Sequence, residues 1–159
     1  MTGSTGSPAS LGDLLPSEAV AAHVEVETWE EAVRASGDLL VATGSATPEY
    51  TDQMIAAIHR YGPYIVIAPG FALAHAQASD DVLNTGMSFM QLAHPVRFGH
   101  EKNDPVRLVA GLASTDHSAH MEALQQLALV LSSPETMEQL LDAGTVDELC
   151  AVLGIPPSK

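Results

Sequence analysis

Histidine is the residue type of this sequence best suited to chemistry at neutral pH, and seven of the 159 residues are histidines. His75 stands apart because the segment Ala68-Pro-Gly-Phe-Ala-Leu-Ala-His75-Ala surrounds it with small and apolar side chains. A neutral imidazole nitrogen acts as a nucleophile or a proton acceptor near pH 7. His75 is therefore either a core residue with satisfied hydrogen bonds or a reactive group at a strand end, where ligands of open α/β sheets bind.

His117 and His120 are a second candidate site, because two histidines three residues apart share one face of a helix. Together with His75 they favour an alternative function, that of a metal-binding enzyme. The signal for zinc is weak, since no H-E-x-x-H motif occurs and the only cysteine is Cys150. Asp116, just before the pair, has a sufficient structural explanation as a helix N-cap.

The other four histidines have simpler interpretations. His23 and His59 are expected on solvated faces, whereas His94 and His100 lie in loop-like sequence, where a functional role is open. The sequence contains no G-x-S-x-G, G-x-x-x-x-G-K-[ST] or G-x-G-x-x-G motif. A hydrolase or a nucleotide-dependent enzyme therefore has no support from motifs.

Length and composition predict one compact domain. With 46% hydrophobic and 16% charged residues, the chain is too apolar to be disordered, and its longest apolar runs are too short to cross a bilayer. Residues 1–10 are rich in Gly, Ser and Thr and are expected to be a flexible tail, with residues 11–155 as the domain. No signal peptide is recognisable in the tail, so we expect a cytoplasmic protein without membrane insertion.

The charge balance argues against some classes of partner. Six Lys and Arg residues against 20 Asp and Glu residues give a formal net charge of −14. Such a surface repels nucleic acid phosphates and anionic lipid headgroups. A nucleic acid partner is therefore not expected.

Hydrophobic periodicity predicts strands and helices mixed along the whole chain. Alternating or continuous apolar residues favour strands at 20–26, 39–42, 64–68, 86–92 and 106–112. The run 64–68 is apolar on both faces, as is typical of a central strand covered on both sides.

Capping signals predict where the helices begin and end. A capping box at Thr28 begins a helix that Gly37 is expected to end near residue 35, and Thr47-Pro48 begins a helix that ends at Gly62. The last third is expected to be helical, with starts near Asp116, Ser133 and Thr145. The fold class is therefore α/β, a single domain with a mixed β-sheet flanked by helices on both faces.

One long segment resembles a known family. The stretch Gly62-Pro-Tyr-Ile-Val-Ile-Ala-Pro-Gly-Phe-Ala-Leu-Ala-His75-Ala is similar to the phosphorylation-site segment of enzyme IIA components of the bacterial phosphoenolpyruvate-dependent sugar phosphotransferase system, of the mannitol/fructose type. Further similar segments follow the same order between Asp13 and Leu153: Thr47–Tyr50, Pro95–Gly99, Asn103–Val106, Leu112–Asp116 and His120–Leu124. The ascorbate-specific branch fits best.

The resemblance implies roles for two residues. His75 matches the histidine that the family phosphorylates, and His120 matches a second histidine that lies beside it and stabilises the phosphate. His117 matches no family position and is expected at the surface. The sequence departs from the common Leu-Pro-His-Ala-Arg pattern at Ala74 and Gln77, and the missing arginine removes an expected contact with phosphate or partner.

The resemblance also implies partners. A cytoplasmic phosphocarrier of this type accepts phosphate on His75 from the histidine-containing phosphocarrier protein and passes it to an enzyme IIB component, which in turn serves a membrane permease, enzyme IIC. We expect no cofactor and no metal, and an ascorbate-type transporter as the system served. The alternative within the same fold is a regulatory switch whose phosphorylation state another protein reads.

Overall fold

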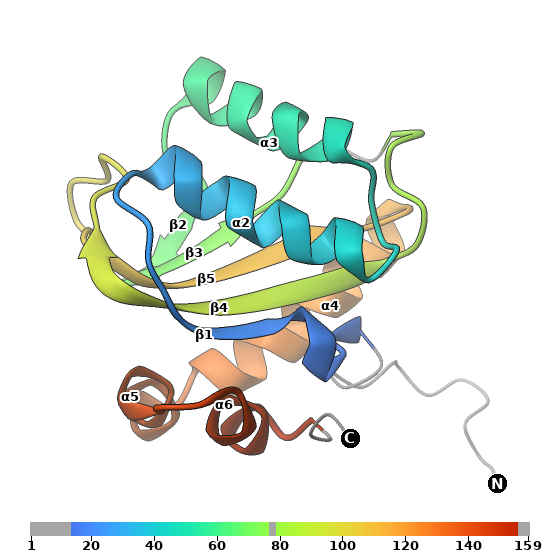
Figure 1. Cartoon of the computed structure of the whole chain (residues 1–159). Coiled ribbons are helices and arrows are strands. Elements are labelled where there is room, and N and C mark those ends of the chain that lie inside the picture. The colour runs from blue at the N-terminus through green and yellow to red at the C-terminus, as the bar shows by residue number, and fades with distance from the viewer. Residues whose placement is uncertain (1–13, 77–78, 156–159) are drawn as a thin grey trace, which may run out of the picture.

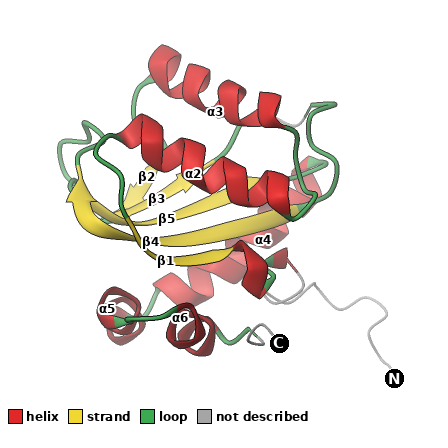
Figure 2. Cartoon of the chain, in the orientation of Figure 1, coloured by secondary structure: helices red, strands yellow, loops and turns green. Residues whose placement is uncertain are grey.

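The computed structural model describes residues 14–76 and 79–155, except for the side chain of His117. The expected tail 1–10 and residue Gln77 lie outside the described residues. The described chain forms a five-stranded sheet with helices on both faces (Figures 1 and 2). The expected fold class is therefore confirmed.

The sheet is mixed, with strand order β1-β4-β5-β3-β2. β5 lies in the middle, antiparallel to β4 and parallel to β3, while β1 is parallel to β4 and β2 is antiparallel to β3. The strands are β1 Val20–Val24, β2 Val66–Ala68, β3 Phe71–Ala74, β4 Gly86–Val96 and β5 Val106–Ala113.

Two helices cover one face of the sheet and three cover the other (Figure 2). The first layer holds α2 Trp29–Ala42 and α3 Pro48–Tyr61, and the second holds α4 His117–Leu131, α5 Pro134–Asp142 and α6 Val146–Leu153, with the 3₁₀ turn η1 Ser17–Ala19 before β1. Helix starts follow the predicted caps: Thr28, Ser133 and Thr145 each accept a hydrogen bond from an amide in the first turn. Thr47 differs, because its hydroxyl donates to Asp81 and does not cap α3.

The prediction of a strand at residues 39–42 is wrong, because α2 continues through Gly37 to Ala42. Gly37 is buried against α3, and a Cβ at this position would collide with the side chain of Thr51. The glycine therefore allows close approach of two helices and does not end the first one.

The prediction that residues 64–68 form the central strand is also wrong. Only Val66–Ala68 are a strand, β2 lies at the edge of the sheet, and Ile67 is 48% exposed. β3 was not predicted. It pairs back on β2 after a turn at Pro69-Gly70, where Gly70 has φ +74°. This Pro-Gly pair between two apolar runs was the hairpin signal in the sequence.

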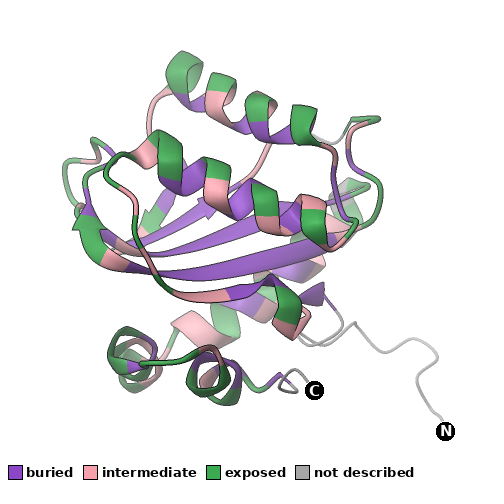
Figure 3. Ribbon diagram, in the orientation of Figure 1, coloured by how far each residue is buried: buried purple, intermediate pink, exposed green. Residues whose placement is uncertain are grey.

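The core is split by the sheet into two apolar clusters, and Figure 3 shows the strands buried between the two helical layers. Along β3, Phe71 and Leu73 pack in the cluster of α4, while Ala72 and Ala74 pack in the cluster of α2 and α3. Strand side chains alternate between faces. The next residue, His75, therefore continues the set that faces α4.

Candidate functional site

Topology brings His75 and His120 to one edge of the sheet. β3 and β5 are parallel, with Ala74 opposite Gly111, so both strands end at the same edge. His75 follows β3 directly, and the chain after β5 passes through Ser114 into α4, whose first turn carries His120. The two imidazole centroids lie 5.4 Å apart. The structure thus brings together two of the predicted site residues.

The imidazole of His75 is oriented by its own strand. Nδ1 lies 2.8 Å from the carbonyl oxygen of Leu73. A carbonyl only accepts hydrogen bonds, so Nδ1 carries the proton in the neutral ring and Nε2 keeps its lone pair. His75 is half-buried. The arrangement presents Nε2 as a nucleophile in a partly enclosed site.

Tyr64 restrains His75 from a second side. Its hydroxyl donates a 2.9 Å hydrogen bond to the carbonyl oxygen of His75, and its ring packs edge-on against the imidazole at a centroid distance of 5.3 Å. Partial burial raises the pKa of the Tyr64 hydroxyl, which keeps it protonated as a donor. These contacts limit the rotation of the imidazole.

His120 belongs to a helix start that the sequence encodes. Asp116 is the N-cap of α4 and accepts a 2.8 Å hydrogen bond from the amide of Ala119. The hydroxyl of Ser114 lies 3.5 Å from Nδ1 of His120. An imidazole is a hydrogen-bond donor whether neutral or protonated, and this one lies beside the ring of His75.

Tyr50 supports the site and was missed as a site residue by sequence reasoning, which placed it only on the apolar face of a helix. Its hydroxyl accepts from the amide of Ala76 at 3.0 Å and donates to the carbonyl of Leu112 at 2.8 Å. It therefore ties the chain after β3 to β5. Burial raises the pKa of Tyr50 to about 12. A tyrosine on a buried helix face was the available signal, because its hydroxyl needs a partner there.

An open cavity of about 890 Å³ lies in front of the two histidines. Its described lining comes from α3, the chain into β2, the segments that follow β3 and β5, and the start of α4: Gln53, Ala56, Ala57, Arg60, Tyr61, Tyr64, His75, Ala76, Ser79, Ser114, Asp116 and His120. The opening leaves room for a partner protein to reach Nε2 of His75.

Backbone amides in the segment Gly70–His75 already have hydrogen-bond partners within the protein. The amide of Gly70 donates to the carbonyl of Asn103, and that of Leu73 donates to the carbonyl of Ile65. Since most of this segment is strand β3, these donors belong to the sheet and its flanking loop. Side-chain donors must therefore supply more of the hydrogen bonds to a bound phosphoryl group.

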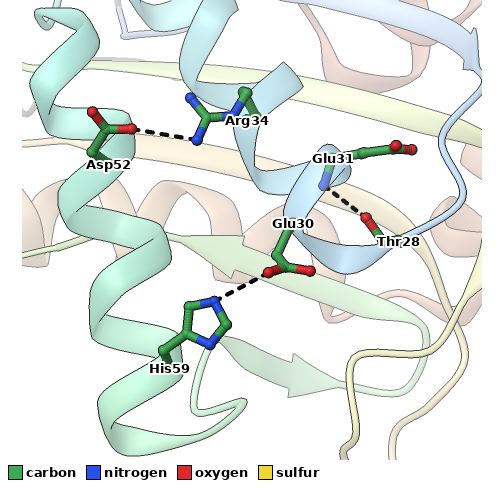
Figure 4. A network of polar contacts seen from close by, with 6 residues as sticks. All are labelled: Thr28, Glu30, Glu31, Arg34, Asp52 and His59. Carbon is green, nitrogen blue, oxygen red and sulfur yellow. Dashed lines mark hydrogen bonds and ion pairs between the residues drawn. The ribbon is translucent and has the colours of Figure 1, made fainter.

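Of the other histidines, His23, His59, His94 and His100 are not among the described residues that line the cavity. His23 and His94 are exposed, and His59 is exposed beside Glu30, with 3.1 Å between Nε2 and the carboxylate (Figure 4). His100 accepts hydrogen bonds from the amides of Lys102 and Asn103, a local structural role. The side chain of His117 lies outside the described residues.

Among the described residues, no three His, Cys, Asp or Glu side chains form a group able to hold a metal ion. None of the described helices is long and apolar enough to cross a membrane.

Comparison with known proteins agrees with this geometry. The family model described as "Phosphoenolpyruvate-dependent sugar phosphotransferase system, EIIA 2" matches residues 13–154. The ascorbate-specific PTS system EIIA component of Escherichia coli (strain K12) is 34% identical over 137 residues, 86% of this chain and 89% of that protein.

Solved structures show the same similarity. The mannitol-specific cryptic phosphotransferase enzyme IIA from Escherichia coli has a TM-score of 0.82 and 30% identity, covering 91% of this chain and 98% of that one. A chain in the complex of enzyme IIA-mannitol and phosphorylated enzyme IIB-mannitol from Escherichia coli has a TM-score of 0.76 and 31% identity, covering 86% and 94%.

Proposed function

The chain belongs to the type 2 enzyme IIA family of the phosphoenolpyruvate-dependent sugar phosphotransferase system, and we propose that His75 is the residue on which it carries the phosphoryl group. The observation that carries this assignment is the 2.8 Å contact between Nδ1 of His75 and the carbonyl of Leu73, which leaves Nε2 as the nucleophile. The cavity in front of the ring supplies access.

The accepting step follows from this tautomer. The Nε2 lone pair of His75 attacks phosphorus on the phosphohistidine of the donor protein. The bond between phosphorus and the donor nitrogen breaks, and its electron pair returns to the donor imidazole. Nδ1 keeps its proton throughout, because it donates to the carbonyl of Leu73. Phosphoryl transfer of this kind needs positioning and charge stabilisation more than covalent help from the protein.

The delivering step is the reverse in form. A nucleophile of the acceptor protein attacks the same phosphorus, the bond to Nε2 breaks, and His75 regains its lone pair. His120 is the stabilising residue in both steps, since its ring centroid lies 5.4 Å from that of His75 and its ring donates hydrogen bonds. It contacts the phosphoryl oxygens but does not carry the group.

Partners follow from the family and from named relatives. The donor is the histidine-containing phosphocarrier protein, and the acceptor is an enzyme IIB component that serves a permease, enzyme IIC. One relative has been solved in complex with phosphorylated enzyme IIB, which supports an enzyme IIB component as the acceptor. The ascorbate-specific relative supports ascorbate as the transported compound, and membership of the family supports the cytoplasm as the place of action.

The test is to phosphorylate the protein with phosphoenolpyruvate, enzyme I and the phosphocarrier protein, and to locate the phosphorus by NMR of protein labelled with ¹⁵N in histidine. We expect one phosphoryl group, coupled to Nε2 of His75. Coupling to Nδ1, or to another histidine, would contradict the assignment.

A further inference from the structure

Phosphorylation creates a charge problem at this site. A phosphoryl group adds up to about two negative charges, on a chain whose formal net charge is already −14. The cavity also contains the carboxylate of Asp116 at its wall. A cation near His75 would therefore lower the cost of holding the group, because opposite charges attract strongly in a partly enclosed site.

Arg60 is the only Lys or Arg among the described residues that line the cavity. It lies in the last turn of α3, while His75 and His120 come from β3 and α4, so three elements contribute to one opening. Arg60 and Asp116 are the only formally charged residues in the described lining. The carboxylate of Asp116 caps α4 and is held there by a hydrogen bond. Arg60 is therefore the charged side chain of the described lining that is able to move toward a phosphoryl group.

The guanidinium of Arg60 is not committed to a carboxylate in the described structure. Ion pairs there join Arg34 to Asp52 and Glu30 to His59 (Figure 4), and neither includes Arg60. Its Cζ lies 5.3 Å from the ring centroid of Tyr61, which is 68% exposed. A cation over an exposed aromatic ring is weakly held. An anion carried by His75 competes well for it.

We propose that Arg60 is a phosphate-binding residue of this protein. When His75 is phosphorylated, the guanidinium leaves the ring of Tyr61 and its planar fork binds the phosphoryl oxygens, as guanidinium groups do with phosphate. Tyr61 holds Arg60 at the mouth of the cavity in the free state. This role rests on the proposed function of His75 as the phosphorylated residue.

The test compares Arg60→Gln and Arg60→Lys with Arg34→Gln. The control removes the same charge from an exposed arginine on α2, outside the cavity lining. Each variant is phosphorylated with the phosphoenolpyruvate mixture and titrated by ³¹P NMR. We expect the phosphoryl pKa to rise in Arg60→Gln, because the nearby cation that favours the dianion is lost. The phosphoryl pKa in Arg60→Lys should lie between the values of Arg60→Gln and the unmodified protein.

Single-turnover transfer from the phosphocarrier protein gives a second readout. Arg60→Gln should slow it roughly 10–100-fold, whereas Arg34→Gln should leave it within about twofold, as for a surface charge far from the reaction. A normal phosphoryl pKa with weaker binding of the phosphocarrier protein would mean that Arg60 only docks the partner, and would overturn the proposal. Melting temperatures verify that each variant is folded.

The experiment also separates this proposal from the one it rests on. If the unmodified protein takes no phosphate on His75, the proposed function fails. If it does, and Arg60→Gln matches Arg34→Gln in both pKa and rate, only the role of Arg60 is lost.

Discussion

At the scale of single residues, the proposed reactivity of His75 depends on one hydrogen bond. Nδ1 is held at 2.8 Å from the carbonyl of Leu73, two residues earlier on the same strand. That contact selects the tautomer that leaves Nε2 nucleophilic, and Tyr64 packs against the ring from the side. The backbone of this segment thus fixes both the orientation and the tautomer of the proposed nucleophile.

The role of His120 is testable by two substitutions. His120→Gln keeps a hydrogen-bond donor and should retain part of the transfer to His75, whereas His120→Ala should slow transfer further, roughly 10–1000-fold below the unmodified protein. Single-turnover rates, measured alongside melting temperatures, check this. Normal rates in both folded variants would mean that His120 only packs at the start of α4, and would remove it from the mechanism.

The pairing of His75 with His120 in the candidate site could be predicted from the sequence, because both residues lie in segments that resemble the family. Tyr50 and Arg60 could not, for a physical reason. Tyr50 acts through its hydroxyl, which contacts two segments distant in sequence. Arg60 lines the cavity only because the end of α3 and the residues after β3 border the same opening. Such relations depend on tertiary structure: a tyrosine on a buried helix face indicates that its hydroxyl needs a partner, but it does not identify that partner.

Tyr50 makes the link between β3 and β5 sensitive to alkaline pH. Its pKa is raised to about 12 by burial, against about 10 in the unfolded chain. This stabilisation is therefore complete below about pH 10 and is lost as pH rises through about 12. Tyr50→Phe should lower the free energy of unfolding by about 1–3 kcal/mol at pH 7 and should weaken the loss of stability above pH 10.

Chemical denaturation at pH 7, 9.5 and 11 measures both effects. A smaller pH dependence of stability should remain in Tyr50→Phe, because burial also raises the pKa of Tyr64. If the unmodified protein and Tyr50→Phe lose stability in parallel above pH 10, the proposed role of Tyr50 is wrong.

At the scale of elements, the packing of α2 on α3 depends on Gly37. Alanine favours helix over glycine by about 1 kcal/mol, so Gly37→Ala would stabilise an isolated helix. Here a Cβ would collide with the side chain of Thr51, and we expect a net loss of about 1–3 kcal/mol of stability. Urea denaturation checks this, with Asp38→Ala on the exposed face of α2 as control.

A second substitution identifies the cause. Combining Gly37→Ala with Thr51→Ala removes the hydroxyl and methyl groups that the new Cβ meets most closely. The double variant should therefore lose less stability than the sum of the losses in the two single variants. Simple additivity would mean that the collision with Thr51 is not the reason for the glycine.

Elements with strong local signals could be predicted, and those decided by packing could not. The capping residues Thr28, Ser133 and Thr145 begin helices as expected, because capping is local. Gly37 was misread as a helix end, since its role depends on Thr51 of a different helix. The position of β2 at the sheet edge depends on strand order, which the apolar run 64–68 does not encode.

At the scale of the whole molecule, we expect partner docking to depend on apolar contacts, because the chain is strongly acidic, with a formal net charge of −14. Tyr61 and Tyr64, 68% and 39% exposed, line the cavity, and Met121, which follows His120, is 42% exposed. We expect Tyr61→Ala to weaken binding of the phosphocarrier protein roughly tenfold, as at interface hot spots. Leu83→Ala, an exposed apolar residue outside the cavity lining, is the control.

The same binding measurement, repeated at different salt concentrations, tests the balance of forces. If apolar contacts dominate, affinity should fall by less than about tenfold between low and physiological salt, since screening acts on charges. A steep fall would show that charge dominates docking and would point to exposed cations such as Arg97 and Lys102.

The most direct test of the central claim is the site of phosphorylation itself. The protein, His75→Ala and the control His59→Ala are incubated with phosphoenolpyruvate, enzyme I and the phosphocarrier protein, and each is measured by intact-protein mass spectrometry. The account predicts one added phosphoryl group on the unmodified protein and on His59→Ala, and none on folded His75→Ala. Stoichiometric phosphorylation of His75→Ala would contradict it and would place the group on another residue, with His120 the first to examine.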